Sequence, residues 1–102
     1  MKIALDYDET FTEDPILWEG FIKLAKERKH VVTFVTYRLD SIDNEDIISD
    51  SKRLGIELVF TNGKQKSSCS SADIWIDDNP VTIPSTASLL LMHRGCIQSG
   101  EG

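Results

Sequence analysis

Short strand-like segments alternate with helix-like segments along this 102-residue chain, and this alternation is the strongest constraint on its fold. The strand-like segments are apolar, and most contain β-branched residues. We expect strands at residues 2–7, 31–36, 56–61, 74–76 and 89–92. Strands that alternate with helices predict an α/β fold, in which helices flank a mostly parallel sheet of about five strands.

A first helix is predicted between the first two strands. Asp14 precedes Pro15, and this pair is typical of a helix that begins with a capping aspartate and has proline at its first position. Apolar residues then recur with the spacing of one helical face. That face consists of Leu17, Phe21, Leu24 and Ala25. We expect these side chains to cover the sheet.

A second helix is predicted between the second and third strands. We expect Asp43 to cap it, and the helix to run through about Leu54. Gly55 follows at the position where helices commonly end with a glycine. The expected core face consists of Ile47, Ser51 and Leu54. Residues 67–72 leave room for a short helix at most.

Composition and charge indicate one soluble domain, because the chain is 40% hydrophobic and 27% charged. We expect that domain at residues 1–97, with a loose tail at 98–102. The net charge of -6 disfavours tight, non-specific binding to nucleic acid. The longest apolar run is far shorter than the roughly 20 residues of a membrane span. We therefore expect no membrane contact, a cytoplasmic location and two free cysteine thiols.

Polar and charged residues follow four of the predicted strands, at the point where each strand ends. In chain order they are Asp6, Asp8 and Thr10, then Thr36 and Arg38, then Lys64 and Lys66, and last Asp77 and Asp78. In folds of this class, ligands bind beyond the carboxyl ends of the strands. The carboxyl ends of parallel strands share one edge of the sheet, so we expect the four groups to meet in one site.

Such a site suits metal-assisted transfer of a phosphoryl group. Several carboxylates close together repel one another, and a hard divalent cation such as Mg²⁺ relieves that repulsion. The cation and a lysine together neutralise a phosphoryl group. One carboxylate can then attack phosphorus to form an aspartyl-phosphate intermediate, while a second protonates the leaving oxygen and later activates water.

The arrangement resembles the haloacid dehalogenase (HAD) superfamily of phosphatases. In chain order, the four motifs of that family match Asp6-x-Asp8-x-Thr10, Thr36, Lys66 or Lys64, and the acidic pair Asp77 and Asp78. The resemblance covers residues 2 to about 80, which is most of the chain. It implies a three-layer, Rossmann-like parallel sheet of the HAD type and a Mg²⁺-dependent phosphatase.

The resemblance also implies catalytic roles for individual residues. It implies that Asp6 is the nucleophile and a Mg²⁺ ligand. Asp8 is then the general acid and base, and its backbone carbonyl also binds the metal. Thr36 would hold the phosphoryl oxygens, and a lysine, either Lys66 or Lys64, would steady the intermediate.

Metal-binding and substrate-binding roles follow from the same resemblance. Asp77 and Asp78 would hold the metal, with Asp78 as the direct ligand. Arg38 matches a Thr-x-Arg variant in which the arginine contacts substrate phosphate. Thr10 and Lys64 complete the expected substrate-binding set, because a hydroxyl can orient a phosphoryl oxygen and an ammonium can neutralise one.

The chain leaves no room for a cap domain over the site, since residues 9–14 allow only a small flap. Capless members of the family act on large or exposed phosphate esters, or borrow a cap from a partner subunit. The resemblance therefore implies a phosphoprotein, a nucleic-acid end or a nucleotide as substrate, and it allows an oligomer or a cap-supplying partner.

Two other functions compete with this interpretation. A non-catalytic HAD-like protein could bind metal or phosphate and regulate a partner. A signalling receiver domain also uses aspartates, a threonine and a lysine on an α/β sheet. Receivers, however, carry the phosphorylated aspartate after the third strand, where this chain has Thr61 and Asn62. The order of the residues therefore disfavours a receiver.

Overall fold

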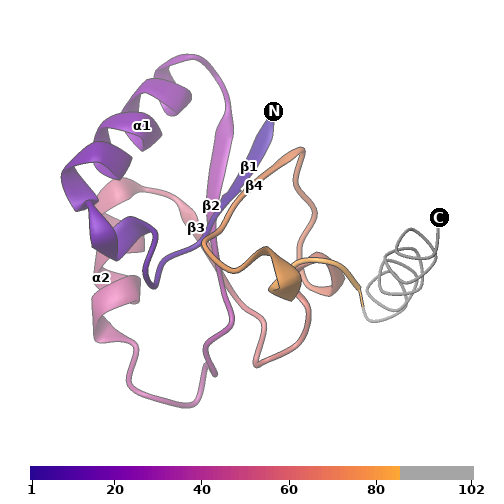
Figure 1. Cartoon of the computed structure of the whole chain (residues 1–102). Coiled ribbons are helices and arrows are strands. Elements are labelled where there is room, and N and C mark those ends of the chain that lie inside the picture. The colour runs from indigo at the N-terminus through magenta and orange to yellow at the C-terminus, as the bar shows by residue number, and fades with distance from the viewer. Residues whose placement is uncertain (86–102) are drawn as a thin grey trace, which may run out of the picture.

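The computed structural model describes residues 1–85, and these form an α/β structure around a four-stranded parallel sheet (Figure 1). The strands are β1 (Lys2–Leu5), β2 (Val31–Thr36), β3 (Glu57–Phe60) and β4 (Ile74–Ile76). Their order across the sheet is β3-β2-β1-β4, and every neighbouring pair is parallel. The expected α/β class and parallel sheet are confirmed. The strand expected at 89–92 and the tail expected at 98–102 lie outside the described residues.

Two α-helices, α1 (Pro15–Glu27) and α2 (Glu45–Leu54), cover one face of the sheet (Figure 1). They share a face because β1, β2 and β3 follow one another in one direction, and right-handed crossovers then put both connections on the same side. Three short 3₁₀ helices complete the described residues: η1 (Phe11–Glu13), η2 (Lys66–Ser68) and η3 (Pro80–Thr82). In residues 1–85 the other face of the sheet has no α-helix, so a third helical layer is not seen there.

The two helix starts differ in how they are capped. Asp14 caps α1 as expected, since its Oδ1 accepts a hydrogen bond from the Leu17 N–H at 3.2 Å. The expectation that Asp43 caps α2 is wrong by one residue in position, because Asn44 occupies the N-cap position. The Asp43 side chain nevertheless accepts a hydrogen bond at the start of the helix, from the Glu45 N–H to Oδ1 at 3.2 Å. Asn44 is buried and its amide donates to the carbonyls of Leu39 and Ile42, which fixes the loop that enters the helix.

The end of α2 is fixed by a glycine and by a lysine from the other helix. Gly55 has φ of 65°, in the left-handed region, as expected for a helix C-terminus. Lys26 of α1 donates from Nζ to the carbonyls of Leu54 and Gly55 at 2.9 and 3.1 Å. A Cβ on Gly55 would lie 2.8 Å from that Nζ. The lysine therefore provides hydrogen bonds to the carbonyls at the end of α2 and links the two helices.

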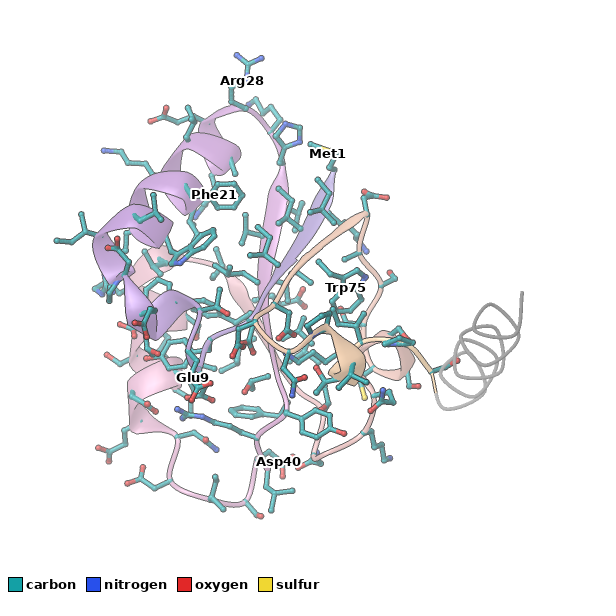
Figure 2. All side chains as sticks on the ribbon, in the orientation of Figure 1. Met1, Glu9, Phe21, Arg28, Asp40 and Trp75 are labelled. Carbon is teal, nitrogen blue, oxygen red and sulfur yellow. The ribbon has the colours of Figure 1, made fainter. Side chains whose placement is uncertain are left out.

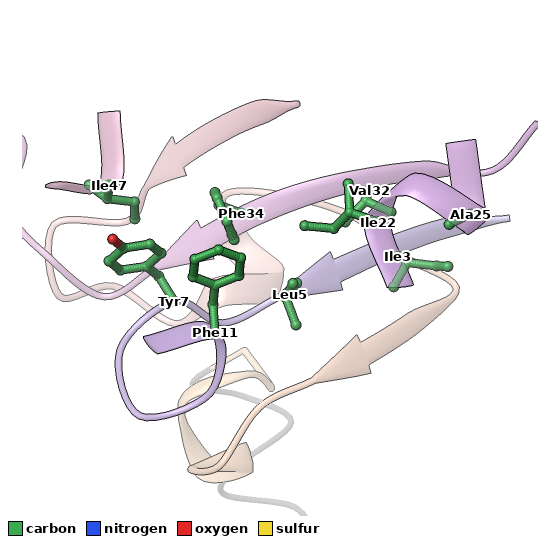
Figure 3. Packing of buried hydrophobic residues seen from close by; sticks show 9 residues of the cluster. All are labelled: Ile3, Leu5, Tyr7, Phe11, Ile22, Ala25, Val32, Phe34 and Ile47. Carbon is green, nitrogen blue, oxygen red and sulfur yellow. The ribbon is translucent and has the colours of Figure 1, made fainter. Parts of the chain in front are cut away.

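The hydrophobic core lies between the sheet and the two helices (Figure 3). Phe34 of β2 has no exposed surface and meets Tyr7 and Phe11 edge-to-face, with ring centroids 5.2 and 5.1 Å apart. Aromatic pairs prefer this geometry. The cluster packs the loop that follows β1 against β2, so it holds the residues after β1 at the carboxyl edge of the sheet.

The expected core face of α1 is confirmed for Ala25, which is buried, and for Phe21, which packs against the core. It is wrong for Leu17 and Leu24, which are each 58% exposed, and it did not include the buried Ile22. The helix packs on β2 and α2, which turns Ile22 towards the centre of the core. Leu24 instead borders an open apolar hollow of about 310 Å³ beside Ile74 of β4, the last strand on that side of the described sheet. For α2, Ile47 and Ser51 are buried and Leu54 packs against the core, as expected.

No helix within residues 1–85 has the length and apolar character that crossing a membrane requires.

Two adjacent isoleucines of α2 give a matched test of this packing. Ile47 has no exposed surface, whereas Ile48 is 38% exposed. We expect Ile47→Ala to lower the free energy of unfolding by about 2–5 kcal/mol, because it removes buried methyl groups and leaves a cavity. Ile48→Ala should change it by about 0.5 kcal/mol or less. Urea unfolding measures both, and equal losses in the two variants would contradict the orientation of α2.

Candidate active site

The candidate site lies at the carboxyl ends of β1 and β4. The chain passes from β1 outwards to β3 and then returns to the other side of β1, so the connections on the two sides of β1 diverge. Such a switch point is where open α/β sheets bind ligands. The backbone N–H of Asp6 donates to the carbonyl of Ile76 at 2.9 Å, which holds the residue after β1 beside those after β4. Glu9, labelled in Figure 2, lies at this end of the sheet, and Met1 lies at the opposite end.

Asp6 is buried at the centre of this site, where a hydroxyl and an ammonium group donate to its carboxylate. The Thr10 hydroxyl donates to Asp6 Oδ2 at 3.1 Å, and Lys66 donates from Nζ to Asp6 Oδ1 at 2.8 Å. Lys66 is only 2% exposed and also forms an ion pair with Asp77. Lys64 is exposed. Of the two lysines that the sequence left open, the structure therefore brings Lys66 into the site.

Three carboxylates form a group that could hold a metal ion. Asp6, Asp77 and Asp78 each offer one oxygen, and these oxygens all lie within 4.8 Å of one another. Asp77 is held by Lys66 and by the N–H of Asn79, which donates to Asp77 Oδ1 at 2.9 Å. Asp78 is exposed. The group contains three of the four expected metal-binding residues, and the side chain of Asp8 lies outside it.

Burial and the neighbouring carboxylates oppose ionisation of Asp6. Together they raise its pKa from 3.8 to about 6: burial contributes most and the hydrogen bond with Asp78 adds to it, although Lys66 acts in the opposite direction. The pKa of Asp78 is lowered, chiefly because its carboxylate shares that hydrogen bond with Asp6. The pKa of Glu9 is raised by its interaction with Asp78. One lysine thus does not balance the negative charge of the site.

Asp8 is paired with Arg38 instead. The guanidinium donates to both carboxylate oxygens of Asp8, at 2.6 and 2.8 Å, and to both oxygens of Asp46, at 2.7 and 2.9 Å. It also lies over the ring of Tyr7, with Cζ 5.3 Å from the ring centroid. These carboxylates raise the pKa of Arg38 above its ordinary value. Arg38 therefore orients Asp8, and its donors face protein carboxylates rather than open space.

A cavity of about 170 Å³ opens over the carboxylate group. It is lined by Asp6, Asp8, Glu9, Thr36, Tyr37, Lys66, Asp77, Asp78, Asn79 and Thr82. Every expected catalytic residue is in this set. The cavity lining does not include the expected substrate-binding residues Thr10, Arg38 and Lys64. The Thr10 hydroxyl donates to Asp6, and Arg38 is held by Asp8 and Asp46.

Sequence reasoning missed five residues that shape this site. Four of them, Glu9, Tyr37, Asn79 and Thr82, line the cavity, and Asp46 anchors Arg38. Tyr37 lies between Thr36 and Arg38, which were both expected in the site. Its position at the end of a strand could therefore have predicted it as a site residue. Asp46 gave no such signal, because acidic residues in the first turn of a helix are common for electrostatic reasons alone.

Comparison of the chain with protein-family models, with curated proteins and with solved structures found no match.

The carboxylate group predicts that a divalent cation stabilises the fold. At free Mg²⁺ tenfold above its dissociation constant, the free energy of unfolding should rise by about 1.4 kcal/mol, or about 6 °C in Tm. Asp78→Asn should shrink this rise, because it removes an exposed carboxylate and leaves the Lys66 ion pairs intact. Thermal unfolding with Mg²⁺ and with EDTA measures the effect, and Asp43→Asn is the control. An equal Mg²⁺ effect in all three proteins would show that the ion binds elsewhere.

The raised pKa of Asp6 predicts a pH-dependent stability. The folded state binds the Asp6 proton more tightly than the unfolded state, so this contribution is full below about pH 4 and is lost as pH rises through about 6. Asp6→Asn mimics the protonated form. At pH 8 in EDTA it should exceed the wild type in stability by about 1–2 kcal/mol, after allowance for solvent screening. The gain should vanish near pH 4.

Urea unfolding at the two pH values measures this gain, with Asp40→Asn, an exposed loop residue, as the control. A stability difference for Asp6→Asn that does not depend on pH would contradict the raised pKa.

Proposed function

We propose that this chain is a capless HAD-like phosphatase, which hydrolyses a phosphate monoester through an aspartyl-phosphate on Asp6. One observation carries the proposal: the buried Asp6 carboxylate lies beside Lys66, Asp77 and Asp78 in a cavity at the switch point of a parallel sheet. This arrangement puts a nucleophile, a cation and further oxygen ligands around one small space. It matches the motif order that the sequence shows.

In the first proposed step, an oxygen of Asp6 attacks phosphorus. The bond from phosphorus to the ester oxygen breaks as the new bond forms, and Asp8 gives its proton to the leaving oxygen. In the second step, Asp8 takes a proton from water, and the water oxygen attacks the same phosphorus. The bond to Asp6 then breaks, which releases phosphate and restores both aspartates.

Arg38 and Asp46 have a place in these steps. When Asp8 carries a proton, it gives up one of its two hydrogen bonds to Arg38. The two hydrogen bonds from Arg38 to Asp46 keep the guanidinium in place during that change. Lys66 and Thr36 line the cavity beside Asp6. Their ammonium and hydroxyl groups can donate hydrogen bonds to phosphoryl oxygens there.

The donor set fits Mg²⁺, because the three carboxylates offer hard oxygen ligands at one edge of a cavity. Asp6, Asp77 and Asp78 would hold the ion, with the backbone carbonyl of Asp8 as a further ligand. When bound, Mg²⁺ supplies positive charge that offsets the carboxylates and the phosphoryl group. The chain's own cation, Lys66, is already engaged with two carboxylates.

The substrate is expected to be exposed, because residues 1–85 form no domain over the cavity. Between β1 and α1 there is only the short helix η1. A phosphoprotein, a nucleic-acid end or a nucleotide can reach such a site, and a partner subunit could supply a cap. A second candidate function is non-catalytic binding of metal or phosphate, and the two hydrogen bonds that hold both oxygens of Asp8 favour it.

Hydrolysis of p-nitrophenyl phosphate distinguishes the two functions. We expect turnover in Mg²⁺ that EDTA abolishes. Asp6→Asn should reduce kcat by about a thousandfold or more, because it removes the nucleophile. Asp8→Asn should reduce kcat by about 100-fold to 10,000-fold. Asp40→Asn, an exposed loop variant, serves as the control and should match the wild type.

Full activity in Asp6→Asn would overturn the mechanism. A folded protein that binds Mg²⁺ but shows no turnover on this or other phosphate esters would favour the binding function.

A further inference from the structure

One aromatic ring borders the cavity, and the proposed reaction does not use it. Tyr37 lines the cavity together with Asp6, Asp8 and Lys66, and the residue is 41% exposed. The nine other lining residues are all charged, amide or hydroxyl residues. Tyr37 therefore gives this cavity its one large apolar surface within the described part of the chain.

Tyr37 is held in place by the loops around it. Its hydroxyl donates to Gln65 Oε1 at 3.1 Å, and Gln65 Nε2 donates to the carbonyls of Val81 and Pro84 at 2.7 and 2.8 Å. The backbone carbonyl of Tyr37 accepts from the Gly63 N–H at 3.1 Å. The side chain is thus fixed before any ligand arrives, so binding against it loses little conformational entropy.

The bonded hydroxyl determines what Tyr37 can offer a ligand. Because the hydroxyl donates to Gln65 and the backbone carbonyl accepts from Gly63, the ring is the part of Tyr37 that these hydrogen bonds leave for a ligand. Aromatic rings attract other flat rings by stacked or edge-to-face contact. The leaving group must lie within reach of Asp8, which lines the same cavity. The ring of Tyr37 is therefore available to the group that departs.

The charges around the cavity further restrict which leaving groups the site favours. Glu9 and Asp78 line the cavity and are exposed. These acids disfavour additional negative charge on the ligand. A leaving group without further phosphates or carboxylates meets less repulsion than a polyphosphate or a nucleic-acid strand does.

We propose that Tyr37 determines specificity, and that the preferred substrates are phosphate monoesters whose leaving group carries an uncharged planar ring close to the ester oxygen. This inference rests on the proposed function, because it assigns the ring to the leaving group of that reaction. The phosphoryl group lies at Asp6 and Lys66, and the ring stacks on Tyr37.

Binding of inert phosphonates tests the inference without any turnover. Benzylphosphonate and cyclohexylmethylphosphonate carry the same charge and similar bulk, and only the first has a flat aromatic ring. Isothermal titration calorimetry in Mg²⁺ should show that the wild type binds benzylphosphonate about threefold to tenfold more tightly. Tyr37→Leu should reduce this preference to about one. Tyr37→Phe retains the ring and should retain the preference.

The outcomes separate this inference from the proposed function. Equal binding of both phosphonates by the wild type, or an unchanged preference in Tyr37→Leu, overturns the role of Tyr37. Turnover of p-nitrophenyl phosphate, measured on the same preparation, would then still support the proposed phosphatase function. If neither phosphonate binds in Mg²⁺, the proposed ring-binding role of Tyr37 is wrong, whether or not the protein hydrolyses p-nitrophenyl phosphate.

Discussion

A buried ammonium between two carboxylates is the interaction on which the site depends. Lys66 bonds Asp6, which follows β1, and Asp77, which follows β4. A charge with 2% exposure must be paired, since an isolated buried charge is very costly. The ion pairs therefore join the two neighbouring strand ends to η2. Without Lys66, two carboxylates would face each other at the centre of the sheet edge.

The sequence predicted the parts of this site that chain order and periodicity determine. Apolar segments located β1, β2, β3 and β4, and the carboxyl ends of parallel strands necessarily share an edge. Asp6 and Asp77 were therefore expected at one edge, and the pairing of β1 with β4 makes them neighbours. The choice between Lys64 and Lys66 could not be made in this way, because both follow β3 and only the path of the β3–β4 connection decides which lysine becomes buried.

Pairings between side chains from distant elements were beyond sequence reasoning. Arg38 was expected to meet substrate, yet Asp46, eight residues further on, holds it against Asp8. The expected face of α1 was wrong at Leu17 and Leu24 for a similar reason, since periodicity identifies an apolar face but not the element it meets. In the described residues, α1 rests on β2 and α2, so Ile22 is buried and Leu24 is not.

The charge balance of the site links its metal-free state to its proposed chemistry. Asp6, Asp77 and Asp78 carry three acidic groups, and Lys66 supplies one positive charge. Without a metal, burial and the neighbouring carboxylates raise the pKa of Asp6 to about 6, which reduces the negative charge of the group. A divalent cation would remove the same excess by binding, and would favour the ionised form of Asp6 that a nucleophile requires. A bound cation would thus offset the same burial and carboxylate crowding that disfavour the Asp6 anion.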